Sequence, residues 1–150
     1  MTQHLFDITF VSAAPFWALM IFAPRWHRTR AITASPLICL PPLLVYAVLV
    51  LPDFGGFFST LANPELPALQ QLLGGSAGAA VAWAHFIAFD LFLGRWIYFD
   101  SRERRIHPAL ISVLLAFTIV FAPLGMLAYL AIRFLREPRR SPRPALLTKA

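Results

Sequence analysis

Four ionisable residues recur at intervals of five in the stretch HFIAFDLFLGRWIYFDSRERR, which covers residues 85 to 105. They are His85, Asp90, Arg95 and Asp100. A carboxyl and an imidazole inside an apolar run are the groups that supply an acid and a base to a reaction shielded from water. A helix turns through about 100° per residue, so neighbouring members of this series lie about 140° apart around its axis. They therefore cannot pair with one another in the ordinary i, i+4 manner.

A second pattern in the same stretch does follow one face of a helix. The spacing i, i+4, i+7, i+11, i+14 is met by His85, Phe89, Phe92, Trp96 and Phe99. One interpretation is packing against the aromatic residues of the first apolar run, Phe16, Trp17 and Phe22. The other is a slot for a flat apolar ligand, with His85 as its polar contact. On that second interpretation the predicted binding residues are Phe89, Phe92, Trp96, Phe99 and Trp17.

The composition predicts which elements position these residues. Hydrophobic residues make up 59% of the chain, charged residues only 13%, and the mean hydropathy is +0.68. These values are typical of an integral membrane protein, and the length of the apolar runs predicts an all-α, polytopic four-helix transmembrane bundle. The predicted spans are about 7–24, 33–52, 73–98 and 108–133, within one domain, 1–137. A basic, proline-containing segment, 138–150, is predicted to be a disordered tail.

Asp90 is the most informative residue in this arrangement. If the third span enters the membrane near Gly74, a rise of about 1.5 Å per residue places Asp90 roughly 24 Å into a hydrocarbon core ~30 Å thick. A carboxylate at that depth costs on the order of 2 to 3.5 kcal/mol, so it must be paired, hydrated or protonated. Asp90 is therefore either a hydrogen-bonding group that holds helices together or a functional group. Its predicted partners are Arg25, His27, Tyr46 and Tyr129.

Prolines inside the predicted spans indicate kinked helices. Pro15 lies within the first span, and Pro123 with Gly125 lies within the fourth. Pro41 and Pro42 remove two amide donors in the middle of the second span. We expect a kink there, with the freed carbonyls lining a cavity or bonded to another helix.

Most of the positive charge lies at the ends of the predicted spans. The formal net charge of +6 is therefore better explained by attraction to anionic lipid headgroups than by nucleic-acid binding. Arg95 is predicted to snorkel to the membrane boundary, with its aliphatic stem buried beside its neighbours. The run that follows is predicted to anchor a loop to the headgroups through Arg102, Arg104 and Arg105.

A four-span topology leaves the charge rule for membrane orientation balanced. The first and third connections hold six arginines, and the segment that follows the fourth span also holds six basic residues. Because the first span usually dominates, we place connections one and three in the cytoplasm and both termini outside.

Other features narrow the functional classes. In the stretch GGSAGAAVAWA, Gly74 and Gly78 are four residues apart, a spacing that favours close helix packing, within the chain or in a homo-oligomer, over a phosphate-binding loop. Cys39 is the single cysteine, and the four histidines lack the spacing of metal ligands. We therefore expect no metal site and no cofactor.

Three segments carry a resemblance to a known family: AAPFWALMIFAPRW, AVAWAHFIAFDLFLGRWIYFDS and FAPLGMLAYLAIR. Together they resemble the small membrane family named for the plant abscisic-acid-deficient protein needed for neoxanthin formation. The resemblance implies a four-span protein of a thylakoid-type or bacterial inner membrane. It also implies a link to the conversion of violaxanthin to neoxanthin, which opens an epoxide into an allene without net redox change. The sequence shows no long N-terminal transit region, which favours a bacterial relative.

Three functions remain open at this stage. The first is a protein that binds a carotenoid or another isoprenoid lipid, as an isomerase with Asp90 as acid and His85 as base or as a binding protein alone. The second is a non-enzymatic assembly or accessory subunit, which the small-residue face favours. The third is a small oligomeric transporter, which the prolines and the charge at membrane depth favour.

Overall fold

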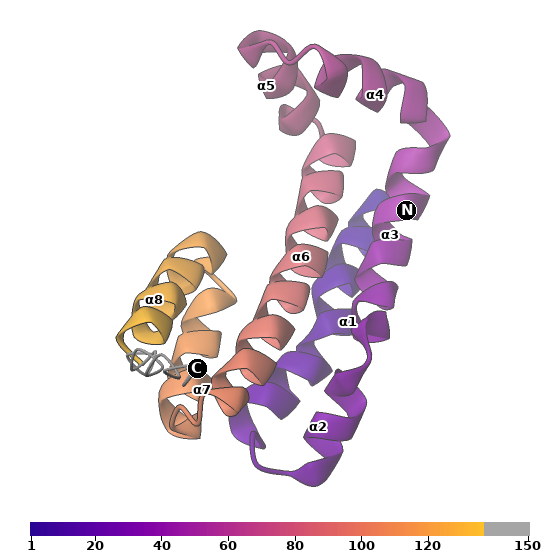
Figure 1. Cartoon of the computed structure of the whole chain (residues 1–150). Helices are drawn as coiled ribbons and strands as arrows, with labels where there is room; N and C mark the ends of the chain where they lie inside the picture. The colour runs from indigo at the N-terminus through magenta and orange to yellow at the C-terminus, as the bar shows by residue number, and fades with distance from the viewer. Residues whose placement is uncertain (137–150) are drawn as a thin grey trace, which may run out of the picture.

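The computed structural model describes residues 1–136, and these residues form an all-helical assembly (Figure 1). The predicted basic tail, 138–150, lies outside the described residues. The elements in chain order are α1 (Thr2–Phe22), α2 (His27–Ala34), the 3₁₀ helix η1 (Pro36–Cys39), α3 (Leu40–Val50), the 3₁₀ helix η2 (Leu51–Asp53), α4 (Phe54–Ala62), α5 (Leu66–Gly74), α6 (Ser76–Glu103), α7 (Pro108–Thr118) and α8 (Ala122–Leu135).

Three helical stretches within residues 1–136 are long and apolar enough to cross a membrane. They are α1 with 21 residues, the continuous stretch Pro36–Ala62 with 27, and α6 with 28. In Figure 1, α1 and α3 lie beside α6, while α4 and α5 cross the end of the assembly that carries the N-terminus. The predicted all-α fold with apolar spanning helices is confirmed to this extent.

The fourth predicted span, 108–133, is not a single helix. It is divided into α7, with 11 residues, and α8, with 14 residues, and α8 turns back alongside α7 (Figure 1). At about 1.5 Å per residue these helices measure roughly 16 Å and 21 Å, too short to cross a core ~30 Å thick. The break precedes Pro123, which has no amide for the carbonyl of Ile119 and whose ring clashes with that carbonyl in a continuous helix. The predicted bundle of four spanning helices is therefore not confirmed: residues 1–136 form three long apolar helices and a helical hairpin.

A glycine allows the two arms of this hairpin to approach each other. A β-carbon on Gly125 would lie 2.9 Å from Cβ and 3.0 Å from Cα of Thr118. Thr118 is fully buried, and its hydroxyl donates a hydrogen bond to the carbonyl of Leu114 over 2.8 Å. Any larger residue at position 125 would push α8 away from α7, so this glycine is needed for the close approach.

The second span accommodates its prolines differently from the prediction. Pro41 and Pro42 lie in the first turn of α3, where amide donors are not needed, and not in the middle of a kinked helix. The 3₁₀ helix η1 precedes them and is capped by Ser35, whose side chain accepts a hydrogen bond from the amide of Leu37. The span reaches its length because η2 and α4 continue beyond α3.

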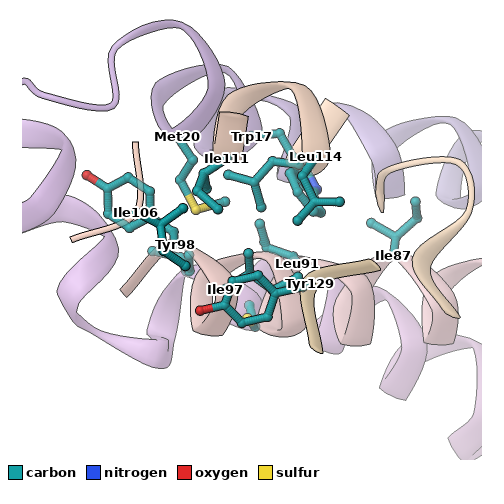
Figure 2. Close-up of a cluster of buried hydrophobic side chains, with 14 residues drawn as sticks. Trp17, Met20, Ile87, Leu91, Ile97, Tyr98, Ile106, Ile111, Leu114 and Tyr129 are labelled. Carbon is teal, nitrogen blue, oxygen red and sulfur yellow. The ribbon is translucent and has the colours of Figure 1, made fainter. Parts of the chain in front are cut away.

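The main core lies where α6 meets α1 and the hairpin (Figure 2). Trp17 and Met20 come from α1, Leu91 from α6, Leu115 from α7 and Tyr129 from α8, and all are buried. Many large apolar side chains are exposed on the surface of the assembly. Examples are Val11, Phe22, Leu44, Val48, Leu51, Val113, Val120 and Leu127. An exposed apolar surface of this extent fits contact with lipid hydrocarbon.

Candidate functional site

A pocket of about 790 Å³ lies between α6 and the end of the α7–α8 hairpin. Its volume is in the range of small-molecule sites, roughly 300 to 1,000 Å³. One wall belongs to α6, and the other belongs to the hairpin turn and the start of α8. The residues of the first wall are Trp83, Phe86, Ile87, Phe89, Asp90, Phe92, Leu93 and Trp96; those of the second are Ile119, Val120, Ala122, Pro123 and Met126.

Asp90 is the one ionisable side chain among these lining residues. It is half-buried, and no other side chain among residues 1–136 forms a hydrogen bond or an ion pair with it. The predicted partner Tyr129 donates its hydroxyl hydrogen to Asp100 instead, and the ring of Tyr46 contacts His85. Among the described residues, the Asp90 carboxyl therefore has no side-chain partner where it lines the aromatic pocket.

The predicted aromatic stripe contributes three residues to this pocket. Phe89, Phe92 and Trp96 line it. His85 is not among the lining residues: its ring stacks on Phe89 with the ring centroids 4.6 Å apart and lies 5.8 Å from Tyr46. The structure therefore does not bring His85 and Asp90 together in one pocket, as expected from their separation around the helix axis.

Two further predicted binding residues lie elsewhere. Phe99 lies 5.2 Å from the guanidinium carbon of Arg95, on the side of α6 that faces α2 and η1. Trp17 is buried in the core where α1 crosses α6 (Figure 2). Its ring lies against Gly94. Trp17 is therefore a core residue, but Gly94 is not part of the aromatic stripe, and Phe22, which the packing interpretation also named, is 84% exposed.

The pocket opens at the outer surface of the helix assembly. The side chains at its mouth are largely exposed: Phe86 at 57%, Phe89 at 58% and Phe92 at 51%. In a membrane these rings contact lipid hydrocarbon, so an apolar molecule can enter the pocket from the side without crossing the headgroup layer.

A polar cluster fixes the hairpin against α6 next to the pocket. One carboxylate oxygen, Asp100 Oδ2, accepts hydrogen bonds from the Tyr129 hydroxyl, from Arg104 Nε over 2.8 Å and from Arg133 Nε over 3.1 Å. Trp96 lies edge-on to the Tyr129 ring, with the centroids 5.4 Å apart. Trp96 also lines the pocket, so this cluster supports the wall that carries Asp90. Sequence reasoning did not identify this role of Asp100.

The remaining arginines of α6 have distinct surroundings. Arg95 donates from Nε to the carbonyl of Thr33 over 2.8 Å and from Nη2 to the carbonyl of Ala34. These are the last carbonyls of α2, where a positive charge is favourable. Arg102 lies over the Tyr98 ring at 4.3 Å, while Arg105 is exposed. Arg95 thus holds α2 against α6.

Sequence reasoning missed the second wall of the pocket. Residues 119–126 line it only because the chain reverses at the hairpin, which continuous hydropathy does not reveal. Part of the first wall did carry a signal: Trp83, Phe86, Asp90 and Leu93 follow the spacing i, i+3, i+7, i+10 of one helical face. A stripe drawn through Asp90 would have found them.

Three long apolar helices, a short hairpin and a lateral pocket lined by aromatic residues and one carboxyl describe a small helical membrane protein. The chain belongs to the ABA DEFICIENT 4-like family, whose model matches residues 4–129. It is 29% identical over 133 residues to Protein ABA DEFICIENT 4, chloroplastic, of Arabidopsis thaliana. That alignment covers 85% of this chain but only 59% of the plant protein. No solved structure matches the chain.

Proposed function

We propose that this protein binds a carotenoid or another isoprenoid lipid in the pocket that contains Asp90. Three observations support the proposal: the aromatic walls, the opening toward lipid, and the membership of a family that includes a chloroplast protein. Because the pocket is an open groove, it fits one end group of such a molecule, while the chain of the ligand extends along the apolar surface. We place the protein in a thylakoid-type or bacterial inner membrane.

We further propose that Asp90 is the acid of an isomerisation of the epoxide-to-allene type. The Asp90 carboxyl donates its proton to the epoxide oxygen as the carbon–oxygen bond breaks. A proton then leaves the neighbouring carbon, and the electron pair of that carbon–hydrogen bond forms the new double bond of the allene. The reaction has no net redox change, so it consumes no oxidant or reductant.

The second step requires a base that takes the proton from carbon. The imidazole of His85 lies on the other side of Phe89, outside the pocket lining. The carboxylate that Asp90 becomes after the first step faces the pocket directly, so we assign it the proton from carbon. One carboxyl then serves both steps and ends the reaction protonated, as it began.

The single observation that carries this proposal is the unpaired Asp90 in the pocket. A carboxyl that only joined helices would have a hydrogen-bonding partner, because leaving it unpaired at membrane depth is costly. The other two functions lack a comparable observation. The small-residue face is partly used within the chain, since a β-carbon on Gly78 would lie 2.7 Å from the carbonyl carbon of Leu72 in α5. The residues that line the pocket offer a transported ion no ionisable side chain besides Asp90.

The test compares Asp90→Asn and Asp90→Leu with the wild type in a bacterial host that makes epoxide-bearing carotenoids. Bound pigment per chain is measured after gentle detergent purification, and the isomers formed are separated by chromatography. For a catalytic acid, Asp90→Asn should retain pigment and lose turnover by at least about 10²-fold. Asp7→Asn, an exposed carboxyl of α1, is the matched control and should behave as wild type.

The two parts of the proposal fail in different ways. Full turnover by Asp90→Asn would overturn the acid role and leave pigment binding in place. Colourless wild-type protein from a pigmented host would overturn the binding itself. In the binding arm, Phe92→Ala should reduce pigment per chain, because it removes an aromatic ring from the pocket wall, whereas Phe22→Ala, an exposed ring far from the pocket, should not.

A further inference from the structure

The two ends of the helix assembly differ sharply in charge. One end holds α2 and the C-terminal ends of α6 and α8 (Figure 1). Its basic residues are Arg25, Arg28, Arg30, Arg102, Arg104, Arg105, Arg133 and Arg136. The opposite end holds the N-terminal part of α1 together with α4 and α5, and its charged side chains are Asp7, Asp53 and Glu65. Within residues 1–136, this second end carries no lysine or arginine.

The hairpin places the end of α8 at the basic end. α7 begins at Pro108, a few residues after the C-terminus of α6. α8 then runs back toward the end of the assembly at which α7 begins (Figure 1). The hydrogen bonds from Tyr129 and Arg133 to Asp100 join the C-terminal half of α8 to the last turn of α6. Both ends of the hairpin therefore lie on the same side of the assembly.

The turn of the hairpin is suited to membrane depth. Backbone polar groups in hydrocarbon must be satisfied within the protein. Each of the three amides of the turn donates a hydrogen bond within the protein. Ile119 donates to the carbonyl of Leu115 over 3.1 Å, and Val120 and Phe121 donate to the carbonyl of Phe117 over 3.2 Å and 3.0 Å. The exposed side chains of the turn, Val120 and Phe121, are apolar. A surface loop in water would require neither feature.

We propose that α7 and α8 form a re-entrant hairpin that enters and leaves the membrane at the basic face, and that this face lies against the anionic headgroups of the cytoplasmic-side leaflet. The N-terminus then lies on the opposite side of the membrane from Arg136. In a four-span topology the basic residues are divided equally between the two sides of the membrane. With a re-entrant hairpin, every described arginine outside the spans lies on one side, which is the arrangement that the charge rule favours. This inference does not depend on the proposed function.

Single cysteines test the topology in a Cys39→Ala background, expressed in a bacterial host. The variants are Arg28→Cys, Glu65→Cys and Arg136→Cys, labelled with a membrane-impermeant maleimide in right-side-out and in inverted membrane vesicles. We expect Glu65→Cys to be labelled in right-side-out vesicles, and Arg28→Cys and Arg136→Cys in inverted vesicles, each with at least a tenfold preference. Labelling in detergent confirms that each thiol is accessible. If Arg28→Cys fails this control, Arg105→Cys replaces it; if Arg136→Cys fails, Leu135→Cys replaces it, because Leu135 is the last residue of the hairpin and is 81% exposed.

Two results would overturn parts of the inference. If Arg136→Cys is labelled from the same side as Glu65→Cys, the fourth segment crosses the membrane and the re-entrant hairpin is wrong. If all three variants show reversed sidedness, the basic face does not lie on the cytoplasmic leaflet, and the assignment to anionic headgroups there is wrong. Neither result bears on pigment binding, so this test and the test of Asp90 remain separate.

Discussion

The indole of Trp17 lies directly against Gly94, at the point where α1 crosses α6. A β-carbon on Gly94 would lie 2.5 Å from Cζ3 of the ring. Trp17 is only 3% exposed, so the ring has little room to move aside. Gly94 thus sets the separation of the two helices that form the centre of the core.

Replacing Gly94 with leucine should destabilise the protein by about 1 to 3 kcal/mol, the usual range for overpacking a core. Thermal unfolding in detergent, followed by circular dichroism, measures the change. Gly55→Leu is the matched control, because a β-carbon at Gly55 meets nothing within 4 Å. An equal effect of the two substitutions would show that the crossing of α1 and α6 is not closely packed.

Asp100→Asn should loosen the hairpin, because the charge-assisted hydrogen bonds from Arg104 and Arg133 and the bond from Tyr129 lose their anionic acceptor. Hydrogen bonds to charged groups contribute about 1.5 to 3 kcal/mol, and we expect a destabilisation of that order. Tyr129→Phe removes one donor and should have a smaller effect, about 0.5 to 1.5 kcal/mol. Glu103→Gln, an exposed carboxyl on the same turn, is the control. Faster proteolysis within residues 104–121 would report the loosened hairpin, and unchanged protease resistance would contradict it.

Arg95→Gln should destabilise the docking of α2, since glutamine has no charge and cannot reproduce the two bonds to the carbonyls of Thr33 and Ala34. The expected effect is about 1.5 to 3 kcal/mol. Arg95→Lys should recover only part of it, because an ammonium lacks the planar fork of a guanidinium. Arg25→Gln, at an exposed arginine before α2, controls for loss of charge alone. Tolerance of Arg95→Gln in unfolding experiments would support the snorkelling interpretation instead.

Arg105→Gly should stabilise the protein. Arg105 has a φ of 55°, in the left-handed region that favours glycine. It follows the end of α6 in a Schellman motif: the amide of Ile106 donates to the carbonyl of Ser101 over 2.9 Å, and the amide of Arg105 to the carbonyl of Arg102 over 3.0 Å. Relief of the left-handed strain should contribute about 1 kcal/mol. A lowered unfolding temperature would show instead that the arginine side chain contributes more than its backbone conformation costs.

The presence of long apolar helices could be predicted because the length of an apolar run is a local property of the sequence. The division of the fourth apolar run into two short helices could not be predicted. Its hydropathy is continuous, and Pro123 indicated only an irregularity, whereas the reversal of α8 depends on the contact of Asp100 with Tyr129 and Arg133, 29 and 33 residues away. Pro41 and Pro42 were misplaced for a related reason: sequence alone did not show that a 3₁₀ helix precedes them and that α4 supplies the missing length.

The candidate site was predictable in chemistry but not in geometry. Asp90 and the aromatic residues Phe89, Phe92 and Trp96 were selected because a carboxyl and large rings are unusual in combination at membrane depth. The sequence did not show which face of α6 meets the hairpin, because a stripe of residues centred on His85 fits the helical spacing equally well. The aromatic side chain of Trp17 suits a ligand-binding residue, and only its contact with Gly94 shows that it belongs to the core.

The opening of the pocket beside Phe86 and Phe92 also determines how its occupancy must be expressed. Lipid acyl chains have direct access to the same groove, so a bound molecule displaces hydrocarbon and not water. Its apparent affinity is then a ratio of mole fractions within the bilayer, and diluting the membrane with additional lipid lowers occupancy even when the total amount of ligand in the sample is unchanged. Selectivity in such a competition rests on the features that acyl chains lack, a rigid ring for the aromatic walls and an oxygen for the carboxyl of Asp90.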